Sequence, residues 1–196
     1  MRVKTRITLT VVLLAFMNLF AIGQTSKDSS NSVSVTTLKK LTLGYDAGAE
    51  WEQKISRFST LSLFAGVTVG LSTDDWTDFW AKTIIGPSTF VEYKNYYNLQ
   101  KRADKGKKTA NNSGNFLLFQ TEVFFPVKNQ NYLGILFSQG WGMQRAISKK
   151  INFELKTSVI EHIFYDRYVY NLGGAPYVKP YVKFQPLVLF SFSYLF

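Results

Sequence analysis

The carboxyl-terminal segment alternates between large apolar side chains and small polar ones. Its apolar members are Val188, Phe190, Phe192, Tyr194 and Phe196. Successive residues of a β-strand point to opposite faces, so these five side chains share one face and Ser191 and Ser193 share the other. The segment therefore predicts a strand that is apolar and aromatic on one side only. A fold that contains it must cover that side with protein or with another apolar phase.

The same period of two recurs along most of the chain and predicts an all-β fold. The longest alternating segments are Leu38–Glu52 and Phe58–Thr73. Further strands are expected at Ser88–Leu99, Asn115–Phe125, Tyr132–Gln144, Ile151–Glu161 and about Tyr181–Phe196. Asp74–Pro87 and Gln100–Gly114 are expected to be connections, the second with a helical turn at its start.

The first 23 residues have the organisation of a secretory signal. Arg2, Lys4 and Arg6 precede an apolar stretch at Ile7–Phe20, and small residues follow at Ala21–Gly23. We expect cleavage before Gln24, an uncleaved anchor helix being the alternative. Residues 24–37 are rich in Ser, Thr, Asn and Lys, and we expect them to be a flexible periplasmic leader. The folded domain would then span residues 38–196.

The polar row of the strands indicates which face is inside. In Leu38–Thr73 this row consists mainly of Gly, Ser, Thr, Asp and Glu, which suit a crowded lumen, while the opposite row of Leu, Val and Ala suits lipid. Strands in lipid must close into a cylinder because a free edge cannot be hydrated there. A barrel with both ends on one side needs an even strand number. We therefore expect a transmembrane antiparallel up-and-down β-barrel of about eight strands, the eighth at Phe164–Leu172 or, less favoured, Ser32–Leu38. A soluble lipocalin-like barrel is the alternative.

This combination of signal, strand number and aromatic final strand resembles the small outer-membrane barrels typified by OmpX and the membrane domain of OmpA. The stretch Glu92–Arg102, with Gly106–Thr109 and Asn112–Asn115, is similar to a block in uncharacterised outer-membrane barrels of Bacteroidota. The resemblance implies surface, adhesion or structural roles without shared catalytic residues.

Three groups of side chains are candidates for specific roles. A salt-bridged lumenal charge network is expected from Asp46, Glu50, Glu92, Lys94, Glu122, Glu154 and Lys156, because buried charges must be paired. Membrane-interface aromatic residues are expected at Trp51, Trp76, Trp80 and Trp141. The set Phe190, Phe192, Tyr194 and Phe196 is expected to act as an assembly and insertion signal. An ion or solute path is the alternative reading of the charges.

Catalytic and metal chemistry have little support in the sequence. The chain has no cysteine and one histidine, His162. Ser158 would share a face with His162 on a strand but would lie about 13 Å away, and Glu161 would point to the opposite face. The basic connector at Lys101–Lys108 could bind anionic sugars, although such a run is usually only solvated. We expect no catalytic residues, no metal and no cofactor.

The sequence thus favours a non-enzymatic outer-membrane barrel with a structural or surface-interaction role. A channel or binding barrel for a small solute or hydrophobic molecule is the second hypothesis, and a lipid A-modifying enzyme is the third. The net charge of +10 suits an anionic lipid surface. The expected partners are outer-membrane lipids, lipopolysaccharide and the outer-membrane assembly machinery, with no nucleic acid. We expect a monomer in the cell outer membrane, exported by the general secretory pathway.

Overall fold

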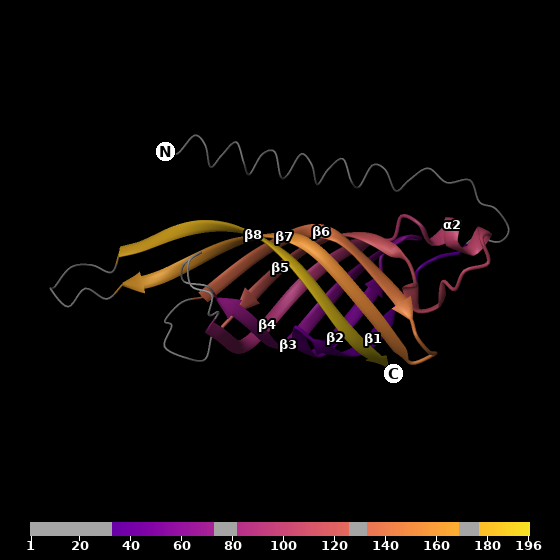
Figure 1. Ribbon diagram of the computed structural model, residues 1–196, viewed down its shortest axis with the longest axis horizontal. Helices are drawn as coiled ribbons and strands as arrows, with labels where there is room; N and C mark the ends of the chain where they lie inside the picture. Colours follow the sequence, from indigo (N-terminus) through magenta and orange to yellow (C-terminus); the bar gives the residue numbers. More distant parts are fainter. Residues whose placement is uncertain (1–32, 73–81, 126–132, 169–176) are drawn as a thin grey trace, which may run out of the picture. The chain divides into compact units, whose positions relative to one another are not determined.

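The computed structural model describes residues 33–72, 82–125, 133–168 and 177–196, which fold into a closed antiparallel β-barrel (Figure 1). Its strands are β1 (Leu38–Gly44), β2 (Asp46–Lys54), β3 (Ser59–Ser72), β4 (Lys82–Asn95), β5 (Asn115–Phe124), β6 (Leu133–Ala146), β7 (Ile151–Tyr168) and β8 (Tyr177–Leu195). Each strand pairs with its neighbours in the chain, and β8 pairs with β1. The prediction of an all-β, up-and-down barrel of eight strands is confirmed.

The segment Leu38–Glu52 is a hairpin, and its prediction as one long strand was wrong. The chain reverses at Tyr45, and β1 pairs with β2 in a register that places Thr42 opposite Gly48. Paired residue numbers on these two strands always sum to an even number, so residues of the same parity face inward on both. The apolar–polar alternation therefore continues without interruption through Tyr45, and the sequence pattern gives no sign of the turn.

The expected source of the eighth strand was also wrong. Residues up to Tyr168 continue β7, so Phe164–Leu172 does not begin a new strand, and Ser32–Leu38 does not supply one either. The extra strand comes from the hairpin at Tyr45. β4 begins at Lys82, inside the segment that was expected to be a loop, and it ends at Asn95. The signal segment 1–23 lies outside the described residues.

Side chains divide by parity between the interior and the outer wall. Among the side chains that the structure describes, the even-numbered residues of β1–β7 point inward: Phe64 and Lys94 are fully buried. Odd-numbered neighbours point outward, and Leu63 is 52% exposed. In β8 the parity is reversed, so Ser193 is buried and Phe192 is exposed. The polar row thus faces the interior, as the small and charged residues of that row indicated.

One end of the barrel, here called the terminal end, holds the start of β1 and the end of β8. The connector 96–114 also lies there and contains helix α2 (Leu99–Asp104) and the 3-10 turn η2 (Ala110–Asn112). Figure 1 shows α2 and the chain's carboxyl terminus at this same end. The helical turn expected at the start of the connector is confirmed. No helix within the described residues is long and apolar enough to cross a membrane.

Candidate functional site

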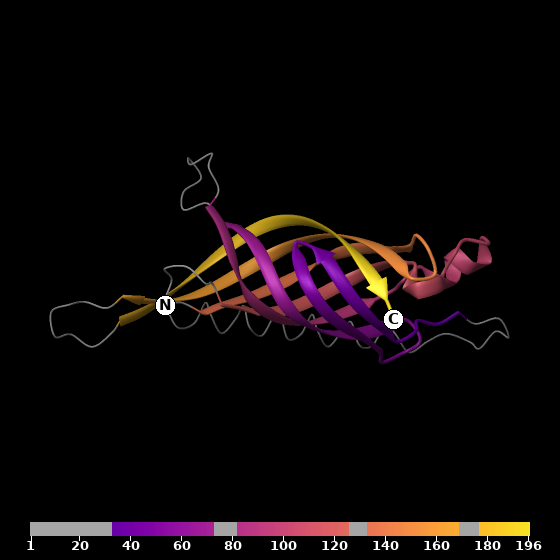
Figure 2. The same cartoon turned by 90° about the horizontal axis from the view of Figure 1, so that it is seen from below.

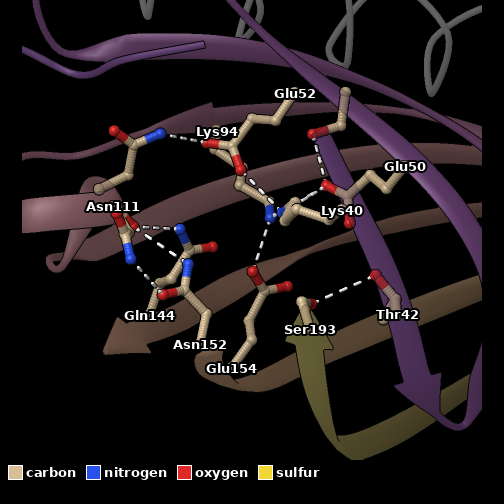
Figure 3. Close-up of polar contacts among 12 residues, drawn as sticks. Lys40, Thr42, Glu50, Glu52, Lys94, Asn111, Gln144, Asn152, Glu154 and Ser193 are labelled. Atoms are coloured by element: carbon tan, nitrogen blue, oxygen red, sulfur yellow. Dashed lines mark hydrogen bonds and ion pairs between the residues drawn. The ribbon is translucent and has the colours of Figure 1, made fainter. Parts of the chain in front are cut away.

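The centre of the barrel contains a chain of ion pairs that we call the lumenal network. It consists of Lys40, Glu50, Glu52, Glu92, Lys94, Glu154 and Lys156. These side chains come from β1, β2, β4 and β7, four strands that the closed barrel brings around one space. Figure 3 shows several of them converging.

Lys94 is the hub of the lumenal network. Its Nζ lies 2.7 Å from a carboxylate oxygen of Glu154, 3.1 Å from Glu92 and 3.7 Å from Glu50. The Lys94 side chain has no exposed surface. Because an isolated charge is very costly to bury, an ammonium at this depth depends on the carboxylates that surround it.

Lys40 and Lys156 extend the network in two directions. Lys40 Nζ lies 2.8 Å from both Glu50 and Glu52. Lys156 Nζ lies 2.8 Å from Glu92 and 3.0 Å from Glu154. Each lysine is therefore shared by at least two carboxylates, and charge alternates in sign along the network.

Neutral hydrogen-bond donors complete the environment of the carboxylates. Asn112 Nδ2 donates to Glu52 at 2.7 Å, and the Tyr96 hydroxyl donates to the same oxygen at 3.0 Å. Ser62 Oγ donates to Glu50 at 2.8 Å. Such additional hydrogen bonds are what a buried ion pair needs to offset its loss of hydration.

A second polar group lies nearer the other end of the lumen. The Thr68 hydroxyl is within hydrogen-bonding distance of Asp46, Glu122 and Ser88. Gln120 Nε2 donates to Glu122 at 3.2 Å. A hydroxyl has one proton, so Thr68 can donate to only one carboxylate at a time. Lys156 of the lumenal network lines the same cavity as Asp46.

A stacked aromatic pair lies in the same part of the lumen. The rings of Phe64 and Phe90 are nearly parallel, with centroids 4.6 Å apart. Gly48 and Gly66 face each other across β2 and β3, and a Cβ at either would lie 2.8 or 2.6 Å from the Phe64 ring. These two glycines therefore make room for the Phe64 side chain inside a narrow barrel.

An apolar cluster closes the terminal end of the lumen. It contains Val35, Tyr96, Leu99, Phe116 and Leu118, each at most 1% exposed. Val35 lies in the segment expected to be a flexible leader, and its N–H donates to the Arg57 carbonyl at 2.9 Å. Here the amino-terminal segment packs beneath the connector.

Asn112 holds the connector against this end. Its side chain accepts a hydrogen bond from the Thr36 N–H at 2.7 Å and donates to the Thr36 carbonyl at 2.9 Å, in addition to the Glu52 contact. Its φ of 56° lies in the left-handed region, which asparagine tolerates better than most residues. One side chain thus joins the amino-terminal segment, the connector and the lumenal network.

We expect Asn112→Ala to loosen the connector by about 2–4 kcal/mol, through lost hydrogen bonds and an unfavourable φ for alanine. Tryptic cleavage at Lys101–Lys108 should become faster, which gel electrophoresis over a digestion time course would measure. The matched control is Gln53→Ala, because that exposed side chain donates only to the Lys54 carbonyl in the described structure. Equal cleavage rates in both variants would contradict the role given to Asn112.

The structure places the other sequence-derived residues as follows. Trp51 is 50% exposed on the outer wall, and Trp141 Nε1 donates to the Tyr97 hydroxyl at 2.9 Å. Trp76 and Trp80 lie outside the described residues. The carboxyl-terminal set is exposed on the outer wall: Phe190, Phe192, Tyr194 and Phe196.

The seven charged residues that the sequence predicted to form one network lie in two groups in the structure. Five of its seven members belong to the lumenal network, whereas Asp46 and Glu122 lie with Thr68. Lys40 and Glu52 were missed, although both have the inward parity of their segment. Tyr96 and Asn112 were missed because nothing in a linear pattern shows that a connector folds back into a lumen.

The residues considered for catalysis or metal binding are placed as follows. The His162 side chain is not among those described, and Ser158 is inward and buried. Within the residues that the structure covers, no group of three or more His, Cys, Asp or Glu side chains could hold a metal ion. Comparison with protein-family models, curated proteins and solved structures finds no match for the chain.

Proposed function

We propose that this chain is an integral outer-membrane β-barrel of the small type typified by OmpX, with a structural or surface-interaction role and no catalysis. A signal at residues 1–23 would direct its export. The terminal end would face the periplasm. The outer wall would contact outer-membrane lipids and lipopolysaccharide, and the exposed aromatic face of β8 would be read by the assembly machinery.

The observation that carries this proposal is the inverted distribution of polarity. Glu92 and Lys94 are fully buried, while Leu43 and Val188 are 69% and 68% exposed. A barrel folded for water would place its charges outside and its leucines and valines inside. Apolar side chains are exposed on several adjacent strands, and so large an apolar surface is typical of a membrane or protein contact.

Aromatic side chains near the terminal end support the same proposal. Tyr97 is 55% exposed and accepts a hydrogen bond from Trp141, and Tyr194 is 46% exposed with Lys150 Nζ 5.5 Å from its ring centroid. Rings with a polar group, together with lysines, prefer the boundary between lipid and water.

The described part of the lumen is filled by side chains, which favours a structural role over transport. The lumenal network, the Phe64–Phe90 stack and the cluster around Tyr96 occupy successive levels of the lumen. An eight-stranded barrel has an interior that side chains can fill. In a planar bilayer, we expect the refolded protein to give no discrete conductance steps.

Heat-modifiable gel migration and vesicle flotation test the membrane assignment. The mature chain, refolded into detergent micelles and then into phosphatidylcholine vesicles, should migrate faster unheated than boiled and should float with the vesicles. A folded, monodisperse protein that stays in detergent-free buffer and does not float would refute the proposal.

A further inference from the structure

Charge is unevenly distributed along the barrel, and the terminal end is strongly basic. Asp104 is the one acidic side chain described at this end outside the lumen. The turns, strand ends and connector described there carry eleven basic side chains: Lys39, Lys54, Arg57, Lys101, Arg102, Lys105, Lys107, Lys108, Arg145, Lys149 and Lys150.

The undescribed parts of the chain do not reverse this balance. Residues 1–32 contain four basic residues and one acidic residue. Asp74, Asp75 and Asp78 follow β3 in the sequence, and β3 ends at the opposite end of the barrel. The remaining acidic residues belong to the lumenal groups or to the half of β7 remote from the terminal end. The terminal end therefore attracts anions from its surroundings.

Two of these basic residues flank the end of β8. The Leu195 N–H donates to the Lys150 carbonyl at 2.8 Å, and the Phe196 N–H donates to the Lys39 carbonyl at 3.3 Å. Figure 2 shows the yellow arrowhead of β8 at the end of the barrel that carries the connector. β8 thus ends between Lys150 on its β7 side and Lys39 on its β1 side, and the two lysines are about two strand spacings, or about 10 Å, apart.

Both lysines lie beside exposed aromatic rings. Lys150 Nζ is 3.2 Å from the Tyr194 hydroxyl and 5.5 Å from the centroid of its ring. Lys39 is exposed, has the outward parity of β1 and pairs with the exposed Trp51. Among the described residues, neither ammonium group has a carboxylate within 4.0 Å. Both charges are therefore available to a molecule outside the barrel.

A third lysine keeps this position cationic. Lys149 is exposed in the same turn as Lys150. A free α-carboxylate at Phe196 would therefore offset only one of three positive charges around the end of β8.

An exposed apolar surface begins directly at the flanking lysines. Tyr194 and Phe192 of β8 pair with Leu41 and Leu43 of β1, and all four side chains are exposed on the outer wall. The surface continues along β8 to Phe190. A molecule that fits both parts has an anionic head and a long apolar body.

We propose that the end of β8 is a binding site for an anionic phospholipid. Its phosphate accepts hydrogen bonds from the ammonium groups of Lys39 and Lys150, and its acyl chains lie along the apolar rows of β8 and β1. The inference rests on the proposed function, since a barrel in a bilayer presents these side chains to lipid. A choline headgroup would bring its own cation to the lysines, and a soluble polyanion would leave the apolar rows uncovered.

Quenching of Trp51 fluorescence by lipids with brominated acyl chains tests this site, because Trp51 pairs with Lys39 on the outer wall. The reporter protein has phenylalanine in place of Trp76, Trp80 and Trp141 and is refolded into mixed vesicles of phosphatidylglycerol and phosphatidylcholine, one of them brominated in each sample. We expect phosphatidylglycerol to be favoured beside Trp51 by about fivefold or more, the factor that about 1 kcal/mol per lysine near an anionic surface implies.

A pair of charge-matched variants locates the site. Lys39→Gln with Lys150→Gln should reduce the preference to about twofold or less, because the phosphate loses both ammonium partners. Lys101→Gln with Lys107→Gln removes the same charge from the exposed connector and should retain the preference. Equal preferences in the two double variants would show that the charge of the whole terminal end is responsible, and would overturn the proposed site.

Heat-modifiable migration of every sample reports folding. If the tryptophan replacements prevent folding, native mass spectrometry of proteins with all four tryptophans, in detergent with equal amounts of both lipids, makes the same comparison. Phosphatidylglycerol adducts should then exceed phosphatidylcholine adducts in the wild type and the connector variant only. A wild type that inserts into phosphatidylcholine vesicles without preferring phosphatidylglycerol refutes this inference alone, whereas one that fails to insert refutes the proposed function as well.

Discussion

Replacing Lys94 by methionine is expected to lower the free energy of unfolding by about 3–5 kcal/mol, the cost of breaking a buried ion pair by removal of one partner. Lys94 is fully buried and lies within 4.0 Å of Glu50, Glu92 and Glu154. Methionine fills a similar volume but leaves these carboxylates with less positive charge nearby. The urea midpoint of tryptophan fluorescence in refolded samples measures the effect.

The control for this substitution is Lys101→Met, on the exposed face of the connector, which should change stability by less than about 0.5 kcal/mol. The double variant Lys94→Met with Glu154→Gln should recover part of the loss, since it also removes one of the unpaired carboxylates. A Lys94→Met protein with the midpoint of the control would show that the lumenal network contributes little to stability.

The sequence was sufficient to predict the barrel because alternation is a local property. Each strand that contacts two environments must repeat with a period of two, whichever strands flank it. The count of eight followed from parity, yet the eighth strand was expected at Phe164–Leu172. The hairpin at Tyr45 preserves the phase of the alternation, so periodicity alone cannot detect it.

The pairing of lumenal charges could not be predicted, because it depends on register across the closed barrel. Lys94 and Glu154 are sixty residues apart in the chain, and they meet because β4 and β7 face each other across the lumen. Inward parity shows that both are inside, but not at which level. The role of Asn112 was unpredictable for a related reason, since it depends on how the connector folds back.

The turn at Tyr45 shows how far a local prediction error extends. As one strand, Leu38–Glu52 would have continued alongside β8. As a hairpin, it supplies a first strand of seven residues beside a last strand of nineteen that contains Pro180 and Pro186. The position of the turn, which composition does not reveal, therefore decides how much of β8 pairs with β1.

Replacing Leu63 by arginine is expected to cause the second large loss of folding free energy in a bilayer. Leu63 is 52% exposed on the outer wall and pairs with Trp51 and Val91, which are also exposed. In a bilayer, arginine at this depth should cost about 2–4 kcal/mol, because its charge must leave water or distort the lipid. The fraction that folds into phosphatidylcholine vesicles, read by heat-modifiable migration over a urea series, measures this cost.

The cost of an arginine on the outer wall depends on its depth only if the wall contacts lipid. Comparing two positions along the wall therefore tests whether lipid or water surrounds the barrel. Gln53→Arg lies on the same outer face at the terminal end of β2, and near the boundary it should cost at most about 1 kcal/mol. If the wall faced water, both substitutions would replace an exposed side chain by a well-hydrated one and would each stay within about 0.5 kcal/mol. A large loss at Leu63 with a small one at Gln53 is expected only when the middle of the wall contacts an apolar phase, and two equally small losses would contradict a membrane-spanning barrel.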